Sequence, residues 1–188
     1  MIALIDYGAG NLTSVRKALA AIAAPVVIPA APDALSGVSG IIIPGVGHYG
    51  ATAALDDTWR RGIARAVDAG VPLLGICLGL QYLFEGSDEA LPHVGWNTVE
   101  LTRRSPLVEG IPTGTSFYFT HSYAAPVTDA CVAQTKHSAA FAAIVERERV
   151  FGAQFHPEKS GDAGVRVLRN FVEITGSLTR HVTRFTDH

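Results

Sequence analysis

The sequence predicts an α/β fold in which helices flank a mostly parallel central sheet, with additional strands in the C-terminal half. Three observations lead to this prediction. Short runs of Ile, Val and Leu end at Gly or Pro, as strands buried on both faces of a parallel sheet do. Amphipathic helical patterns lie between these runs. The length of 188 residues suits one domain, covering residues 1–188, with its own core.

The first half of the chain alternates expected strands with expected helices. The strands are expected at residues 2–5, 25–28, 41–43 and 71–76. Helices are expected at residues 12–23 and over a segment that ends at Gly70, a suitable C-cap. This alternation indicates parallel strands joined by right-handed crossovers.

The second half carries strand-like patterns with short turns. Strands are expected at residues 98–101, 116–123, 130–134 and 150–155. Residues 139–145 fit a strand or a helix, and the pattern does not separate the two. A final helix is expected at residues 164–175, followed by a polar tail, 177–188, that we expect to fray.

Charge and composition exclude several classes of protein. The net charge of −2 provides no basic surface for nucleic acid or an anionic membrane. Two cysteines do not form a disulfide framework, and Asp6 comes too early for a signal peptide. No apolar run approaches the ~18 residues that span a bilayer. We therefore expect a cytoplasmic protein.

The most informative segment surrounds Cys77. A buried strand runs into a cysteine that stands between Gly75 and Gly79, and a helix is expected to follow. This is the nucleophile-elbow pattern with cysteine in place of serine. A helix N-terminus near the sulfur favours the reactive thiolate, and the N–H of Leu78 can stabilise an oxyanion. A small buried core cysteine is the alternative.

A base and an orienting group for such a cysteine lie near the other end of the chain. His156 follows an apolar strand, and Glu158 stands two residues later with Pro157 between them. The carboxylate can then fix the imidazole tautomer, which completes a Cys-His-Glu triad. A strand-end histidine beside a solvated glutamate is the alternative, and the turn at Cys77 argues against it.

Together these segments resemble the class I (triad) glutamine amidotransferases. The resemblance rests on residues 75–81, Gly-Ile-Cys-Leu-Gly-Leu-Gln, and on residues 154–158, Gln-Phe-His-Pro-Glu. It implies a flavodoxin-like fold and attack of Cys77 on the side-chain amide of glutamine. His156 would protonate the departing ammonia and then assist hydrolysis of a glutamyl thioester.

Further motifs resemble one branch of that family, the glutaminase subunits of imidazole glycerol phosphate synthase, which serve histidine biosynthesis. The motifs occupy residues 6–12, 44–47, 93–97, 118–123 and 159–160. The resemblance implies a heterodimer with a (β/α)8-barrel cyclase that forms imidazole glycerol phosphate and AICAR. It implies no cofactor. Activity is expected to be low until that partner carries its nucleotide ligand.

The same resemblance assigns roles by position. Val46 and Gly47 would form the oxyanion strand with Leu78, supported by Asn11, for which helix capping is the plainer role. Glutamine would be held by four residues: Gln81, Glu89, Ser122 and Tyr123. The partner would be contacted by Trp96, Tyr118 and Lys159.

Other patterns are weaker. Residues 45–50 formally match G-x-G-x-x-G, but the first strand–helix turn, where a dinucleotide fingerprint belongs, reads differently. The histidines at 48, 93, 121 and 137 lack the close spacing of a zinc site, so we expect no metal. Cys131 is expected to be inert core.

The sequence departs from the family pattern at one place. Family members carry a glycine-rich stretch and a short strand between Glu89 and His93, and here Ala90-Leu91-Pro92 joins the two directly. This leaves the placement of Glu89 open. Other readings also stay open: another class I glutaminase, of the anthranilate or pyridoxal phosphate synthase type, a silent regulatory domain of the same fold, or a cysteine hydrolase of unrelated substrates.

Overall fold

A computed structural model describes residues 1–176, except 9, 48 and 84–88, and gives only the backbone of 49–51 and 89. The strands are β1 (Ile2–Leu4), β2 (Val26–Val27), β3 (Gly40–Ile43), β4 (Leu73–Ile76), β5 (Glu89–Thr98), β6 (Glu100–Leu101), β7 (Ser116–Ala124), β8 (Cys131–His137), β9 (Ala139–Arg147) and β10 (Val150–Ala153). The α-helices are α1 (Leu12–Ala21), α2 (Asp57–Asp68), α3 (Leu78–Tyr82) and α4 (Gly161–Ile174). Four 3-10 helices join them: η1 (Pro32–Leu35), η2 (Tyr49–Ala54), η3 (Pro106–Val108) and η4 (Pro157–Lys159).

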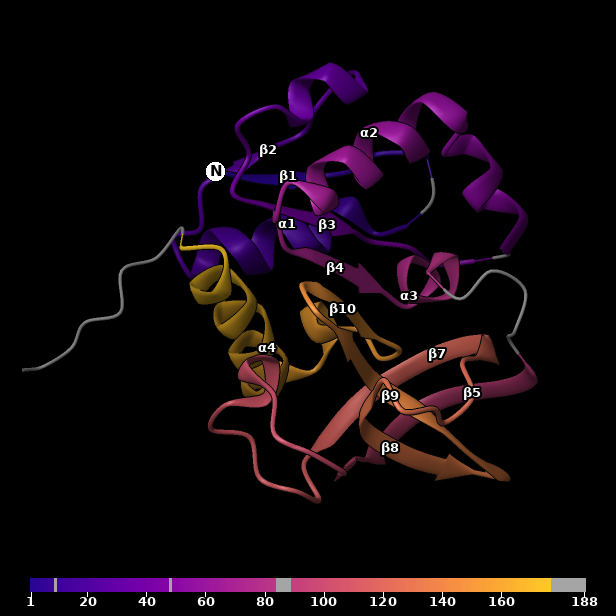
Figure 1. The fold of residues 1–188 in the computed structure, drawn as a ribbon. Helices are drawn as coiled ribbons and strands as arrows, with labels where there is room; N and C mark the ends of the chain where they lie inside the picture. The colour runs from indigo at the N-terminus through magenta and orange to yellow at the C-terminus, as the bar shows by residue number, and fades with distance from the viewer. Residues whose placement is uncertain (9, 48, 84–88, 177–188) are drawn as a thin grey trace, which may run out of the picture.

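Within the described residues the main sheet has eight strands, in the order β2-β1-β3-β4-β10-β9-β8-β6. The first five are parallel, and β9, β8 and β6 extend the sheet in antiparallel fashion. The antiparallel pair β5–β7 forms a second, separate ribbon. In Figure 1 this ribbon lies below α3 and alongside β8 and β9.

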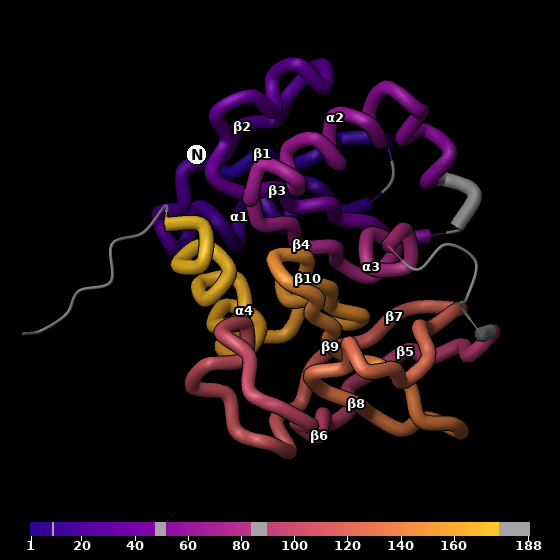
Figure 2. Tube along the Cα trace, viewed as in Figure 1, coloured from indigo at the N-terminus to yellow at the C-terminus, as the bar shows by residue number. Residues whose placement is uncertain are grey.

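Alternation along the buried strands divides the core between the two faces of the sheet. Ile2 and Leu4 of β1 face the same core cluster as residues of α1 and α4. Ala3 of β1 and Ile5 face a second cluster that includes Ile63 of α2. Helices therefore cover both faces of the parallel part, as Figures 1 and 2 show, because each central strand must bury both of its faces.

The predicted fold is confirmed, and the differences concern particular segments. The predicted strand 98–101 is divided, because Thr98 ends β5 and Glu100 starts β6. The undecided segment 139–145 is a strand, β9, paired with β8. The last helix starts three residues earlier than predicted, at Gly161. The predicted tail lies outside the described residues.

The sequence analysis missed β5 as a strand of ten residues. Pro92 and Gly95 lie within it, and both residues normally argue against a strand. The pairing with β7 shifts between Ala90 and His93, so an irregularity in register accommodates the proline. Among the described strands β5 pairs only with β7, so a proline on its other edge removes no hydrogen bond between strands.

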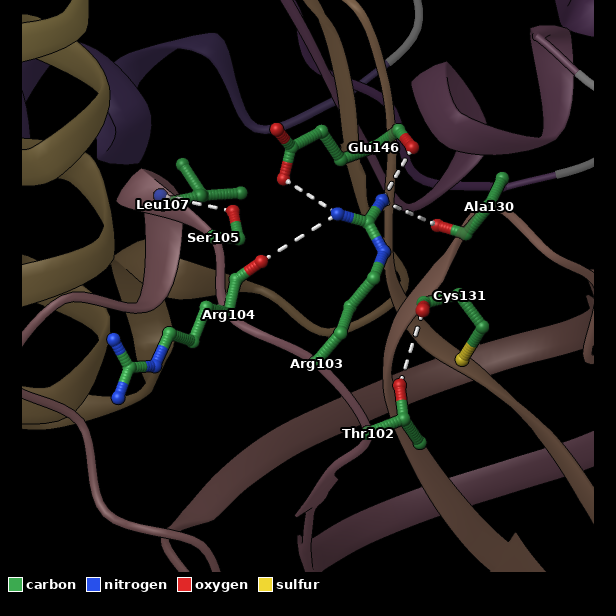
Figure 3. Close-up of polar contacts among 8 residues, drawn as sticks. All are labelled: Thr102, Arg103, Arg104, Ser105, Leu107, Ala130, Cys131 and Glu146. Atoms are coloured by element: carbon green, nitrogen blue, oxygen red, sulfur yellow. Dashed lines mark hydrogen bonds and ion pairs between the residues drawn. The ribbon is translucent and has the colours of Figure 1, made fainter.

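Arg103 ties the segment after β6 to the edge of the main sheet (Figure 3). Its Nη2 donates to the carbonyls of Glu146, at 2.6 Å, and Ala130, at 3.4 Å, while Nη1 lies 3.4 Å from Glu146 Oε2. The neighbouring Thr102 donates its hydroxyl to the carbonyl of Cys131 at 3.0 Å. No helix in the described part of the chain is long and apolar enough to cross a membrane.

Candidate active site

Cys77 occupies a strained turn between β4 and α3. Its φ of 53° and ψ of −101° are values that residues with a Cβ rarely adopt. A Cβ on Gly79 would collide with the carbonyl oxygen of Ile43, and one on Gly75 would collide with the backbone of Gly79. The two glycines therefore let α3 start directly against the sheet, which is the elbow expected from the sequence.

The thiol of Cys77 is enclosed rather than open. Cys77 is 3% exposed, and its Sγ lies 3.6 Å from the carbonyl oxygen of Thr120 in β7. The side-chain Nε2 of Gln154 points at the sulfur from the other side, at 3.7 Å. The sequence analysis assigned no role to Thr120 or Gln154. Gln154 stands two residues before the histidine, and its complete burial is what distinguishes it.

The histidine and the carboxylate form a buried pair. His156 Nδ1 lies 2.8 Å from Glu158 Oε1, and both side chains are 1% exposed. The backbone N–H of His156 donates to the carbonyl of Tyr118, which fixes the segment after β10 against β7. The other ring nitrogen, Nε2, has no hydrogen-bond partner within the described residues.

The electrostatic environment favours the imidazolium form of His156. Burial lowers the pKa of His156, but the interactions with Cys77 and Glu158 outweigh it and raise the pKa to about 9. A histidine that holds its proton at neutral pH beside a cysteine can stabilise the thiolate and later act as a general acid. This is the chemistry that the triad hypothesis requires.

The predicted oxyanion donor is occupied by a carbonyl. The N–H of Leu78 donates to the carbonyl oxygen of Gly45 at 3.5 Å. Val46 is half-buried, and Gly47 is exposed with a φ of 112°. Neither residue donates a hydrogen bond toward Cys77 in the described structure. An oxyanion could therefore use the N–H of Leu78 only after the Gly45–Val46 peptide has moved.

The residues predicted to hold glutamine are brought together in part. Gln81 is 3% exposed and donates from Nε2 to the carbonyl of Tyr123 at 2.6 Å. Ser122 and Tyr123 are exposed on β7. The side chain of Glu89 lies outside the described residues. Asn11 caps α1 by accepting a hydrogen bond from the N–H of Ser14 at 3.1 Å, the plainer of its two roles.

The three residues predicted to face a partner lie together. Trp96 of β5 is 58% exposed, and its ring meets that of Tyr118 on β7 edge-on, with centroids 6.0 Å apart. The ammonium of Lys159 lies 6.0 Å from the centre of the Tyr118 ring. Trp96 and Tyr118 are register partners in the ribbon, so this patch belongs to one face of β5–β7.

Three of the four histidines that are widely spaced in the sequence lie together in the structure. The ring of His93 stacks on His137 with centroids 4.1 Å apart and meets His121 edge-on at 5.5 Å. The sequence could not show this, because register across β5, β7 and β8 brings them together. Within the described residues no three His, Cys, Asp or Glu side chains are arranged to hold a metal ion. The fourth, His48, lies outside those residues.

His121 makes the stability of the protein depend on pH. Burial, then repulsion from His93, lowers its pKa to about 4, and neither ring nitrogen has a hydrogen-bond partner in the described structure. The unfolded chain takes up a proton near pH 6.5, whereas the folded chain resists it until pH 4. The contribution of neutral His121 to the free energy of unfolding is therefore complete above pH 6.5. As the pH falls toward 4, roughly 2–3 kcal/mol of it is lost.

This prediction is tested by urea unfolding of the protein and of His121→Phe at pH 7 and pH 5. The variant should lose less stability between the two values than the parent. His137→Phe provides the comparison within the cluster: His137 is exposed and is the smallest influence on the pKa of His121, so this variant should change the pH dependence less than His121→Phe does. Equal losses in the parent and His121→Phe would contradict the assignment.

Comparisons with known proteins place this geometry in a family. The pattern described as glutamine amidotransferase class-I matches residues 3–174. The chain is 43% identical to the imidazole glycerol phosphate synthase subunit HisH of Thermococcus kodakarensis, over 91% of this chain and 98% of that protein. The chain belongs to the class-I glutamine amidotransferases, among the HisH subunits. Identity to the HisH subunit of Methanocaldococcus jannaschii is 39%, over 93% of this chain and all (100%) of that protein.

Solved structures agree with the HisH assignment at the level of the fold. The structure of PurLQS from Thermotoga maritima superimposes with a TM-score of 0.77 at 20% identity, covering 92% of this chain and 97% of that one. The alignment with the Thermococcus HisH spans 197 positions, although only 91% of this chain takes part. The relative therefore carries residues that this chain lacks.

Proposed function

We propose that Cys77, His156 and Glu158 form the triad through which this chain hydrolyses glutamine. The chain is a glutaminase subunit of imidazole glycerol phosphate synthase and serves histidine biosynthesis, as its family membership indicates. The observation that carries the triad is the buried His156–Glu158 pair, which keeps a proton beside a thiol held on a strained turn.

The reaction follows from these positions in two halves. The Cys77 thiolate attacks the side-chain amide carbon of glutamine, and the tetrahedral oxyanion collapses to a glutamyl thioester as His156 gives its proton to departing ammonia. Neutral His156 then takes a proton from water, which attacks the thioester and releases glutamate. Glu158 holds the Nδ1 side of the ring, so Nε2 is the nitrogen that exchanges the proton.

Oxyanion stabilisation is the step at which turnover would be controlled. We assign it to the N–H of Leu78 and to a peptide N–H of the strand through Val46 and Gly47. The carbonyl of Gly45 blocks the first donor in the present arrangement. Glycines permit the rotation that would clear it, so a state with an open oxyanion hole can exist at a modest energetic cost.

The remaining assignments are proposals of the same kind. Gln81, Glu89, Ser122 and Tyr123 would bind the glutamine substrate, with Asn11 supporting the oxyanion strand. The partner would be a (β/α)8-barrel cyclase, with which this chain would form a heterodimer in the cytoplasm. The whole chain would act as one domain in that complex. Trp96, Tyr118 and Lys159 would form its docking face, because an exposed tryptophan flanked by a tyrosine and a cation is the composition of a binding hot spot.

The experiment measures glutamate and ammonia release from glutamine by the subunit alone and by the subunit with a purified barrel cyclase and its nucleotide ligand. Turnover should rise at least tenfold with the loaded partner, since clearing the Leu78 N–H restores a donor worth 10²–10³ in rate at other oxyanion holes. Lys159→Ala should weaken partner binding several-fold while leaving partner-free turnover within about twofold.

Lys136→Ala, an exposed lysine on β8, is the matched control and should bind the partner like the parent. Fast turnover without a partner would be consistent with the triad but would contradict control of turnover by the oxyanion strand. No turnover under either condition would favour the alternative of a silent domain.

A further inference from the structure

Tyr7 carries a buried hydroxyl that the triad does not use. Tyr7 is 9% exposed and packs in the core cluster that includes Ile5 and Ile43. Its Oη has no hydrogen-bond partner within the described residues. Leaving a buried hydroxyl without a partner costs about 1–3 kcal/mol of stability. Phenylalanine would fill the same space without that cost, so packing alone does not explain a tyrosine at this position.

The hydroxyl lies directly beside the peptide that blocks the oxyanion hole. A Cβ built on Gly45 would collide with Tyr7 Oη and would stand 2.5 Å from the Cβ of Leu78. The three groups therefore converge on one point: the Tyr7 hydroxyl, the backbone of Gly45, and Leu78, the residue whose N–H the Gly45 carbonyl occupies. Burial raises the pKa of Tyr7, and Cys77 is close enough for its charge to raise it further.

In the described structure, which is the resting arrangement, the hydroxyl of Tyr7 is a donor without an acceptor. The Gly45 carbonyl accepts from the N–H of Leu78 over a long 3.5 Å, and Tyr7 donates to nothing in the described structure. When the Gly45–Val46 peptide rotates, the N–H of Leu78 becomes available to the substrate oxyanion. The Gly45 carbonyl then needs a new donor, because a buried carbonyl without one is costly.

We propose that Tyr7 is a positioning residue of the glutaminase, whose hydroxyl donates to the Gly45 carbonyl once the peptide has rotated and so stabilises the open oxyanion hole. This inference rests on the proposed function, since it presupposes that rotation. The hydroxyl costs stability in the resting state and recovers a hydrogen bond in the open state. Tyr7 thereby lowers the free energy of the open state relative to the resting state, without contacting glutamine.

The test is Tyr7→Phe, which removes only the hydroxyl. Turnover of glutamine should fall about three- to tenfold, the effect of one net hydrogen bond. The KM for glutamine should change less than twofold, because substrate contacts remain. Partner-free turnover should fall at least as much as partner-stimulated turnover, since the open state is rarer without the partner. The melting temperature should stay equal or rise.

Tyr82→Phe is the matched control. Tyr82 packs against the same core cluster from α3, and its ring, which faces the guanidinium of Arg60 at 5.6 Å, is retained. Its turnover should equal that of the parent. Labelling of Cys77 by a glutamine-like diazoketone, 6-diazo-5-oxo-L-norleucine, is followed in all three proteins to report the nucleophile separately.

The outcomes distinguish failure of the proposed glutaminase function from failure of the role of Tyr7. If the parent neither turns over glutamine nor is labelled, the proposed function fails. If the parent is active and Tyr7→Phe matches it in turnover, the role of Tyr7 is wrong and the glutaminase stands. A Tyr7→Phe protein that melts several degrees lower and loses activity in proportion would show a purely structural tyrosine and would also overturn the proposal.

Discussion

Cys77→Ala is expected to lower glutamine turnover by at least ~10³-fold, with the fold retained. In the proposed mechanism the reaction proceeds through a covalent bond to Sγ of Cys77. No other described thiol can replace it, because Cys131 is buried at the start of β8 and contacts the carbonyl of Ala133. Removing a covalent nucleophile costs up to ~10⁶ in comparable enzymes. Glutamate release in the presence of the loaded partner is the measurement.

Cys131→Ala is the control for Cys77→Ala and should keep turnover within about twofold. Circular dichroism and partner binding should be unchanged in both variants, because alanine fits the space of a cysteine. If Cys77→Ala turned over glutamine at the rate of the parent, both the nucleophile and the thioester would have to be abandoned.

Gly79→Ala is expected to destabilise the protein by about 3 kcal/mol or more and to abolish covalent labelling of Cys77. The added methyl group would meet the carbonyl oxygen of Ile43, which is backbone of a central strand and cannot turn aside. Helix α3 would have to lift from β3, which would move both Cys77 and the N–H of Leu78. Overpacking against rigid backbone exceeds the usual cost of an extra methyl group.

Gly37→Ala is the matched control for this steric effect. Gly37 has a φ of 79° and open space where a Cβ would stand, so alanine there costs only the left-handed conformation, ~1 kcal/mol. Urea unfolding of the two variants compares the effects. A Gly79→Ala protein as stable as Gly37→Ala would contradict the close approach of α3 to β3.

The parallel half of the fold and the candidate triad could be predicted because both depend on local signals. Apolar runs that end at glycine or proline mark the strands through residues 41–43 and 71–76. The elbow at Cys77 and the spacing of His156 and Glu158 are properties of short segments. Cys77 is far in sequence from His156 and Glu158, but the two segments follow the carboxyl ends of β4 and β10, which are neighbouring parallel strands, and such ends meet at one edge of a sheet.

The features that sequence could not supply depend on register between distant strands. The cluster of His93, His121 and His137 exists because β5 pairs with β7 and lies against β8. The contact of Thr120 with Cys77 is made by a carbonyl, which every residue possesses. The hydrogen bond from the N–H of Leu78 to the Gly45 carbonyl depends on the orientation of one peptide, which residue types do not reveal.

The strand β7 has a consequence for how proteins of this branch can vary in length. Its carbonyls at Tyr118, Thr120 and Tyr123 accept from the His156 backbone, the Cys77 thiol and Gln81. Inserting or deleting one residue among them would misplace one set of these contacts and turn the following side chains to the opposite face. β7 should therefore have constant length across homologues.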